Sequence, residues 1–204
     1  MAASAHRRTL KPRKNPQQAR SADTMAALLE AAARILETRG FDGYTTNYVA
    51  ARAGVSIGSV YQYFPNKDAL TLALIERETA LLLEELAAIA TDSTYEAGIG
   101  QLIRAAIRHQ LRRPELARLL DFEEQRLPAT RRDQQVSTVI TNLVIALLRL
   151  PSAPAVSNPQ LAAADVLAMV RGIVDGAGHR AETNAANLQR RVECAVRGYL
   201  ASVA

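Results

Sequence analysis

The sequence has little of the chemistry that a disulfide-bonded, membrane-spanning or metal-binding protein needs. Its 204 residues include one cysteine, Cys194, no tryptophan and only 4% aromatic residues. One cysteine forms no internal disulfide and no multi-cysteine metal site, so we expect a reducing, cytoplasmic location and no metal or cofactor. No segment reaches the roughly eighteen uncharged apolar residues that span a bilayer, and we expect no membrane partner.

Patterns typical of β-strands are also missing. No run alternates polar and apolar residues, whereas Ala and Leu are abundant and nearly every long stretch favours helix. We therefore predict an all-α fold, with a first helix from Ser21 that ends at Gly40. Further helices are expected near residues 95–112, 114–125, 130–150, 159–178 and 184–202, with a proline-rich loop at Leu150–Pro159.

Positive charge is concentrated at the N-terminus. The first 20 residues contain six basic residues and no acid, which leaves the rest of the chain at −1 out of a net charge of +5. Pro12 and Pro16 oppose a helix there. We predict a flexible basic arm that meets a polyanion, most simply nucleic acid. The alternative is a solvated tail without a partner.

Two short helices follow, and their spacing indicates a DNA-binding motif. Thr45 or Thr46 is a suitable cap for the first, Gly54 breaks the chain after barely two turns, and Ser56 is a suitable cap for the second, which Pro65 ends. A tight turn with glycine lets the second helix cross the first steeply and protrude. This is the pattern of a helix-turn-helix, whose second helix enters the major groove.

These residues resemble the DNA-binding domain of TetR-type repressors. The resemblance covers about residues 24–75 and includes Ala53-Gly54-Val55-Ser56, Gly58-Ser59-Val60-Tyr61-Gln62-Tyr63-Phe64 and Asn66-Lys67-Asp68-Ala69-Leu70. It implies a three-helix DNA-binding domain and a larger helical ligand-binding and dimerisation domain. It also implies a homodimer that represses transcription from a palindromic operator until a small-molecule effector releases it. We expect a flexible basic arm at 1–20, the helix-turn-helix domain at 21–68 and the effector-binding and dimerisation domain at 69–204.

The resemblance also indicates which residues contact double-stranded operator DNA. Carried over position by position, these are Thr46, Asn47, Ser56, Ile57, Gly58, Ser59, Tyr61, Gln62, Tyr63 and Lys67. From the arm we add Arg13, Lys14 and Arg20, which can reach phosphates or a minor groove. Phe41 and Phe64 are expected in the core, whereas for Tyr61 and Tyr63 we favour DNA contact over core packing because each has a hydroxyl.

In the C-terminal half, the last two long helices carry apolar stripes that we expect at the dimer interface, with packing inside the monomer as the alternative. These stripes are Val166, Val170, Ile173, Val174, Leu188, Val192, Val196 and Leu200. Few aromatic residues lie here, so we expect a mainly aliphatic effector pocket. Its polar candidates are Arg104, Arg108, His109, Asp121, Glu123, Glu124 and Arg126, with Phe122 as an aromatic candidate. The alternative for each charged one is a solvated helix face.

Two other classes of function fit parts of the sequence. In an all-helical enzyme, Asp121, Glu123 and Glu124 with His109 would be the acid-base or metal site. The sequence, however, has no Glu-x-x-His pair, nucleophile elbow or glycine-rich phosphate loop, so we expect no enzyme. A nonspecific or architectural DNA-binding protein would fit the basic arm. It would have no use for groups such as Gln62 that can read base edges.

Overall fold

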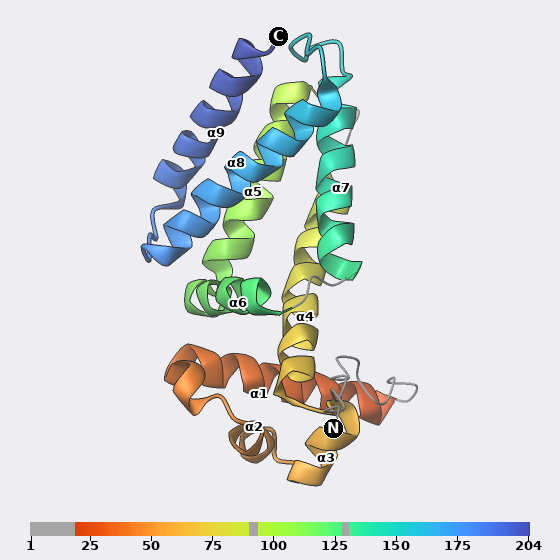
Figure 1. Ribbon diagram of the computed structural model, residues 1–204, viewed down its shortest axis with the longest axis vertical. Helices are drawn as coiled ribbons and strands as arrows, with labels where there is room; N and C mark the ends of the chain where they lie inside the picture. The colour runs from red at the N-terminus through yellow and green to blue at the C-terminus, as the bar shows by residue number, and fades with distance from the viewer. Residues whose placement is uncertain (1–18, 90–93, 128–130) are drawn as a thin grey trace, which may run out of the picture. The chain divides into compact units, whose positions relative to one another are not determined.

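The computed structural model describes residues 19–89, 94–127 and 131–204. Every regular element in these ranges is a helix, which confirms the predicted all-α class (Figure 1). The chain divides into two compact units: one ends at Arg77 and takes in Gln125–Leu127, and the other holds Glu78–Glu124 and Pro128–Ala204. Among the helices so described, none combines the length and apolar character required to cross a membrane.

The first unit consists of three helices, the beginning of a fourth and, with Gln125–Leu127, the end of a later helix. Helix α1 spans Ala19–Gly43, α2 Thr46–Ala53, α3 Ile57–Tyr63 and α4 Lys67–Ala87. Helix α2 packs against both α1 and α3. Within α1 the backbone kinks at Gly40, which has φ +59° and ψ −158°. An added Cβ there would meet nothing within 4 Å, so the backbone conformation, and not a lack of space, favours glycine.

The core of the first unit is formed by side chains from all four helices. Leu28, Leu36, Val49 and Phe64 are fully or almost fully buried, as expected for Phe64. Each such side chain contributes about 1.5 to 3 kcal/mol through the apolar surface it removes from water. Tyr44 is buried as well, and its hydroxyl lies 3.1 Å from that of Thr71, so the phenol keeps a hydrogen bond. This packing holds α3 in place within the unit.

The second unit contains the end of α4 and five further helices. They are α5 Tyr95–Arg112, α6 Pro114–Arg126, α7 Arg131–Leu148, α8 Pro159–His179 and α9 Ala185–Ser202. Both ends of each lie within two residues of the helix expected from the sequence. Helix α5 packs against α7, α8 and α9. Close contact between α5 and α7 requires Gly98, where a Cβ would lie 2.3 Å from Leu147 Cδ2.

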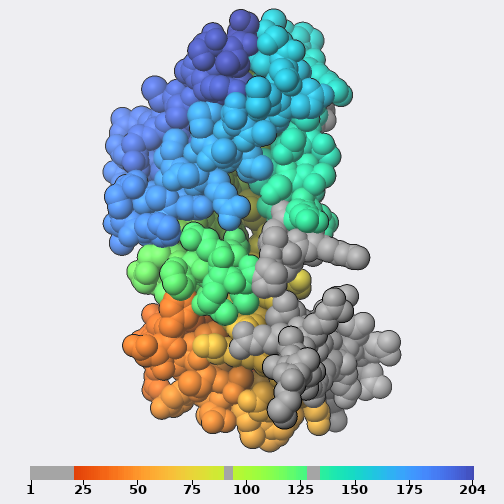
Figure 2. Space-filling model, viewed as in Figure 1, coloured from red at the N-terminus to blue at the C-terminus, as the bar shows by residue number. Residues whose placement is uncertain are grey.

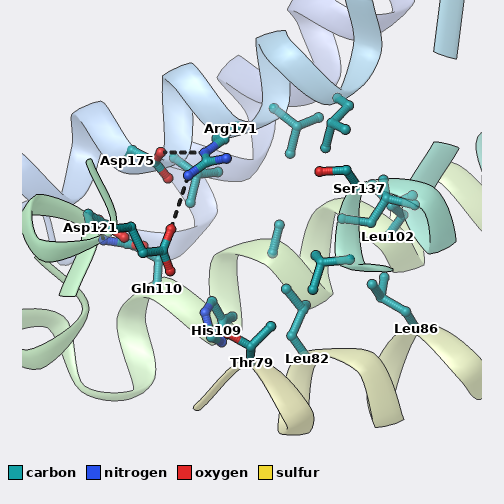
Figure 3. A pocket seen from close by; sticks show the side chains of 17 residues that line it. Thr79, Leu82, Leu86, Leu102, His109, Gln110, Asp121, Ser137, Arg171 and Asp175 are labelled. Carbon is teal, nitrogen blue, oxygen red and sulfur yellow. Dashed lines mark hydrogen bonds and ion pairs between the residues drawn. The ribbon is translucent and has the colours of Figure 1, made fainter. Parts of the chain in front are cut away.

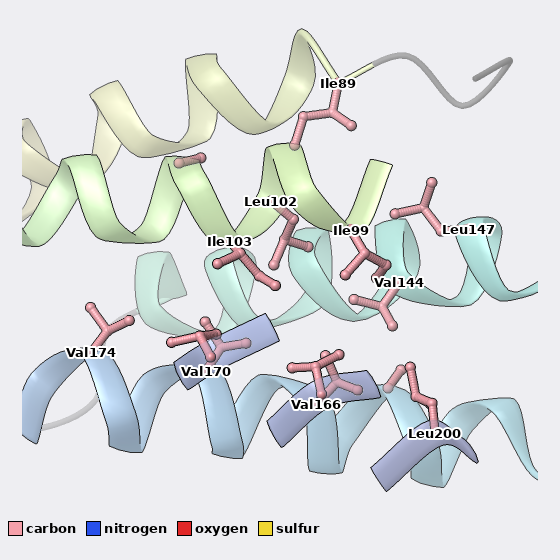
Figure 4. Packing of buried hydrophobic residues seen from close by; sticks show 14 of the residues in the cluster. Ile89, Ile99, Leu102, Ile103, Val144, Leu147, Val166, Val170, Val174 and Leu200 are labelled. Carbon is pink, nitrogen blue, oxygen red and sulfur yellow. The ribbon is translucent and has the colours of Figure 1, made fainter. Parts of the chain in front are cut away.

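The apolar stripes expected at a dimer interface instead form the core of this unit (Figure 4). Val166, Val170, Val174, Leu188, Val192, Val196 and Leu200 are each at most 4% exposed in the single chain, and Ile173 packs against them partly buried. A side chain buried inside one chain is not available to a second. The expectation is therefore corrected: a stripe on an amphipathic helix requires a partner, and here that partner is the same chain.

Candidate functional site

The turn between α2 and α3 forms from local side-chain chemistry. Thr45 Oγ1 accepts a hydrogen bond from the backbone N–H of Tyr48 at 3.3 Å and begins α2. Gly54 ends α2 in the left-handed conformation, with φ 69° and ψ 28°, which glycine adopts without strain. Ser56 Oγ then accepts from the N–H of Ser59 at 3.1 Å and begins α3. The predicted helix-turn-helix is thus formed as its caps indicate.

The beginning of α3 is open to solvent. Ser56, Ile57 and Gly58 are exposed, including the apolar Ile57 at 38%. A Cβ added to Gly58 would meet only Ser56 Oγ, at an ordinary 3.7 Å. Glycine inside a helix costs about 1 kcal/mol relative to alanine. The fold therefore has room for a side chain at position 58, where the sequence has none.

Most of the residues predicted to contact DNA lie on the outside of this motif. Asn47, Ser56, Ile57, Gly58, Tyr61, Gln62 and Lys67 are exposed, and Thr46 and Ser59 are half-buried. The hydroxyls of Thr46 and Tyr61 lie 3.2 Å apart, so a hydrogen bond joins the start of α2 to the middle of α3. Tyr61 stays 43% exposed despite this bond.

Tyr63 is placed differently from its neighbours. It is only 7% exposed, and its hydroxyl lies 3.1 Å from Ser21 Oγ of α1. Tyr63 follows the buried Val60 by three residues, so it shares the inner face of α3. The three-residue spacing from Val60 indicates a buried position for Tyr63. The prediction of a DNA contact followed instead from its hydroxyl, which requires a polar partner. In this structure the partner is within the chain.

The start of α4 supplies a cation beside the motif. Asn66 Oδ1 accepts from the N–H of Ala69 at 2.9 Å, and the exposed Lys67 places its Nζ 5.4 Å from the centre of the Tyr44 ring. An ammonium and the free amides of a helix start together suit a phosphate. Of the arm residues, Arg13 and Lys14 lie outside the described part of the chain. Arg20 belongs to α1, but its side chain is not among those described.

The second unit contains a cavity of about 150 Å³. Figure 3 shows that its two ends differ: leucines of α4 and α5 lie at one, and polar side chains of α5, α6 and α8 gather at the other. The leucines include Leu82, Leu86 and Leu102. The polar group is His109, Gln110, Asp121, Glu124, Arg171 and Asp175. The cavity thus has both an apolar surface and hydrogen-bonding groups.

Ion pairs and hydrogen bonds order the polar end. The guanidinium of Arg171 contacts Glu124 Oε2 at 3.1 Å and Asp175 Oδ2 at 3.4 Å. Gln110 Nε2 donates to Asp121 Oδ2 at 3.2 Å. Burial, with the nearby charge of Asp175, raises the pKa of Asp121 to about 6. Burial likewise raises the pKa of Asp175.

His109 lies close to both ends of the cavity. Burial, followed by the positive charge of Arg112, lowers the pKa of its imidazole, so the ring is neutral at pH 7. Its Nδ1 atom is buried and has no hydrogen-bond partner among the described residues. A buried polar atom without a hydrogen-bond partner destabilises the fold by about 1 to 3 kcal/mol. Such atoms are uncommon in folded proteins.

Of the predicted effector residues, the structure brings His109, Asp121 and Glu124 to the cavity, whereas Glu123 and Arg126 are not among the described residues that line it. Arg104 is exposed, Arg108 is exposed and pairs with Glu85 at 2.7 Å, and Phe122 is 59% exposed. The polar cavity residues that were not predicted include Gln110, Arg171 and Asp175. The sequence indicates these positions only weakly. Arg171 and Asp175 each follow a core valine directly, and a charged residue next to a buried stripe usually lies on the solvent-exposed side of its helix. In the ranges with described side chains, no group of His, Cys, Asp and Glu is arranged to hold a metal ion.

Known proteins share both halves of this arrangement. Residues 28–74 match the family "Bacterial regulatory proteins, tetR family", and residues 94–200 match "Tetracyclin repressor-like, C-terminal domain". The chain is 43% identical over 54 residues to the HTH-type transcriptional regulator EthR of Mycolicibacterium smegmatis, covering 26% of this chain and 25% of that protein. It is 32% identical over 97 residues to the regulator RutR of Escherichia coli K12, covering 48% and 46%.

The matched segments therefore span at most about half of these relatives. A solved structure of a TetR-family transcriptional regulator from Mesorhizobium loti is similar over nearly its whole length. The TM-score is 0.69 at 21% identity, covering 91% of this chain and 98% of that one, a likeness that shows the fold. Because the second family match alone covers more than half of the chain, and the first covers the helix-turn-helix, the chain belongs to the TetR family of bacterial regulatory proteins.

Proposed function

We propose that the chain is a sequence-specific transcription regulator, a repressor that a small-molecule effector releases from a palindromic operator. The observation that carries this proposal is the open approach to α3 at Gly58, where the fold has room for a side chain and the sequence has none. Glycine allows close approach of a ligand to the protein backbone, and a DNA phosphate is a ligand of that kind. Residues 21–68 would bind DNA, and residues 69–204 would bind the effector and a second chain.

Side chains around Gly58 support both kinds of DNA contact. Gln62 is exposed, and its amide can pair with both the N6 and N7 of an adenine. The hydroxyl of Tyr61, held by Thr46 at 3.2 Å, is suited to a phosphate. Lys67 supplies a positive charge for a second phosphate. Arg13, Lys14 and Arg20 would add sequence-independent attraction.

The outer faces of α8 and α9 support a homodimer. With the valine and leucine stripes turned into the core, the exposed positions include small residues: Ala164, Ala168 and Gly172 on α8, and Gly198 and Ala201 on α9. A Cβ added to either glycine would meet nothing within 4 Å. Figure 2 shows α8 and α9 side by side on one face of the second unit. Small residues there let two helices of a partner approach closely.

Helix α6 offers a route from the cavity to the DNA-binding residues. Its Asp121 and Glu124 line the cavity, and its last residue, Arg126, pairs with Asp68 of α4 at 2.9 Å. Asp68 is next to Lys67 in the chain. A ligand that shifts α6 would therefore change the start of α4, where we place a phosphate contact. This coupling is the proposed basis of effector release.

A role in transcription, and not in catalysis, agrees with the relatives, since EthR and RutR are both described as HTH-type transcriptional regulators. Such a role would be exercised in the bacterial cytoplasm, on double-stranded DNA. The competing proposal, a nonspecific DNA-coating protein, shares the basic residues and differs only in sequence preference.

Selection of bound sequences from a random DNA pool, with the purified full-length protein, tests the proposal. A palindrome with half-sites about one helical turn apart is expected from a symmetric helix-turn-helix dimer. Bound DNA without enrichment would favour the coating protein. Failure to bind any DNA, with and without added cell metabolites, would overturn the proposal.

A further inference from the structure

The charges around the cavity are unbalanced. Among the described side chains that line it are three carboxylates, those of Asp121, Glu124 and Asp175, and one guanidinium, that of Arg171. That guanidinium already contacts Glu124 and Asp175, whereas Asp121 accepts a hydrogen bond from the neutral amide of Gln110. Arg171 and His179 also act on Asp121 and lower its pKa, but burial outweighs them. Among the described residues, this wall holds more carboxyl groups than guanidinium groups.

An ionised carboxylate in this position is costly. Transfer from water to a partly buried site penalises the charged form unless a cation compensates it. A ligand with a positive group beside Asp121 would supply that compensation. Among the described side chains, a ligand carboxylate would meet three carboxyl groups and one guanidinium that two acids already share.

The walls and the volume indicate what kind of ligand fits. A cavity of about 150 Å³ has room for a body the size of benzene, and this cavity, which is partly open to solvent, has about that volume. Leu82, Leu86 and Leu102 provide the apolar surface away from the carboxylates.

We propose that the cavity binds a small apolar organic cation, with a body about the size of one aromatic ring and an ammonium group that contacts Asp121. The inference rests on the proposed function in one respect, since it identifies the chemical class of the effector. It gives Asp121 the role of a specificity residue that separates amines from alcohols and carboxylates of the same shape.

The test uses three probes that share one ring and differ in head group: benzylamine, benzyl alcohol and benzoate. Binding to the full-length protein is measured by titration calorimetry at pH 8, without DNA. Benzylamine is expected to bind about tenfold or more tightly than benzyl alcohol, because hydrogen bonds to charged groups contribute more than neutral ones. Benzoate is expected to bind weakest.

Two variants show whether Asp121 is responsible. Asp121→Asn keeps the shape and is expected to reduce the benzylamine preference to about threefold or less while benzyl alcohol still binds. Glu115→Gln removes a carboxylate of the same helix that lies outside the cavity and pairs with Arg118, and it is expected to leave the preference unchanged. Circular dichroism confirms that both variants are folded.

Three results would overturn the inference: no benzylamine binding, benzoate binding as tight as benzylamine binding, or an unchanged preference in Asp121→Asn. Because calorimetry involves no DNA, these outcomes are separate from the DNA selection. If the protein binds an operator but not amines, the proposed function stands and this inference is wrong. If it binds amines but shows no operator preference, the inference about the cavity stands and the proposed function is wrong.

Discussion

Replacing Asp121 by asparagine is expected to stabilise the protein at pH 8 and to have little effect at pH 4. The pKa of this carboxyl is raised from 3.8 to about 6 by burial first and by Asp175 second. Gln110, His179 and Arg171 oppose the rise. A raised pKa means that the folded state favours the protonated acid, so above pH 6 the ionised form destabilises the fold.

The size of the effect follows from the shift. Each pKa unit corresponds to about 1.4 kcal/mol, so full ionisation of Asp121 costs up to about 3 kcal/mol at pH 8. Solvent near the site reduces this cost. We therefore expect Asp121→Asn to raise the free energy of unfolding at pH 8 by about 1 to 3 kcal/mol. As the pH falls through 6 towards 4 the acid is protonated in the folded state, and most of the difference disappears. Asparagine keeps an oxygen that accepts from Gln110.

Urea unfolding of the wild type and Asp121→Asn at pH 8, 6 and 4, at one protein concentration, measures the difference. Glu115→Gln is the matched control, expected to stay within about 0.5 kcal/mol of the wild type because it changes an exposed pair. A variant less stable than the wild type at pH 8 would refute the reasoning. So would a difference that is the same at all three pH values.

Three further substitutions test other positions. Gly58→Ala should stabilise the fold by about 0.5 to 1 kcal/mol in urea unfolding, and it should weaken binding to a selected operator; unchanged affinity would place the DNA elsewhere. Tyr61→Phe should weaken operator binding by about 1.5 to 3 kcal/mol through one lost hydroxyl contact, measured by fluorescence anisotropy, with a wild-type affinity counting against that contact. Gly178→Ala places a Cβ 2.2 Å from Nε2 of the buried Gln110. It should destabilise the fold by about 1 to 3 kcal/mol, and an unchanged unfolding midpoint would show that the amide moves freely.

Elements governed by neighbouring residues were predictable from the sequence. Thr45, Gly54 and Ser56 act within a few residues of themselves, through caps and one left-handed turn, so their types alone indicate the helix-turn-helix. The five C-terminal helices were also located within two residues, because long amphipathic runs have few alternatives.

Features that depend on which helix lies opposite were not predictable. The stripes that include Val166 on α8 and Val192 on α9 show that each helix buries one face. Periodicity does not tell whether the partner of that face lies in the same chain or in a second chain. Arg171 and Asp175 meet Asp121 only because α6 and α8 line the same cavity. Such a meeting depends on tertiary packing, which no local pattern records.

The central claim, that this chain recognises an operator by sequence, is tested most directly by the ratio of two dissociation constants. One is measured for the selected palindrome and the other for a scrambled duplex of equal length and composition, at the same salt concentration. We predict a ratio of about three powers of ten or more, as for specific regulators. A ratio near one would contradict the account and leave a protein that binds only the charge of DNA.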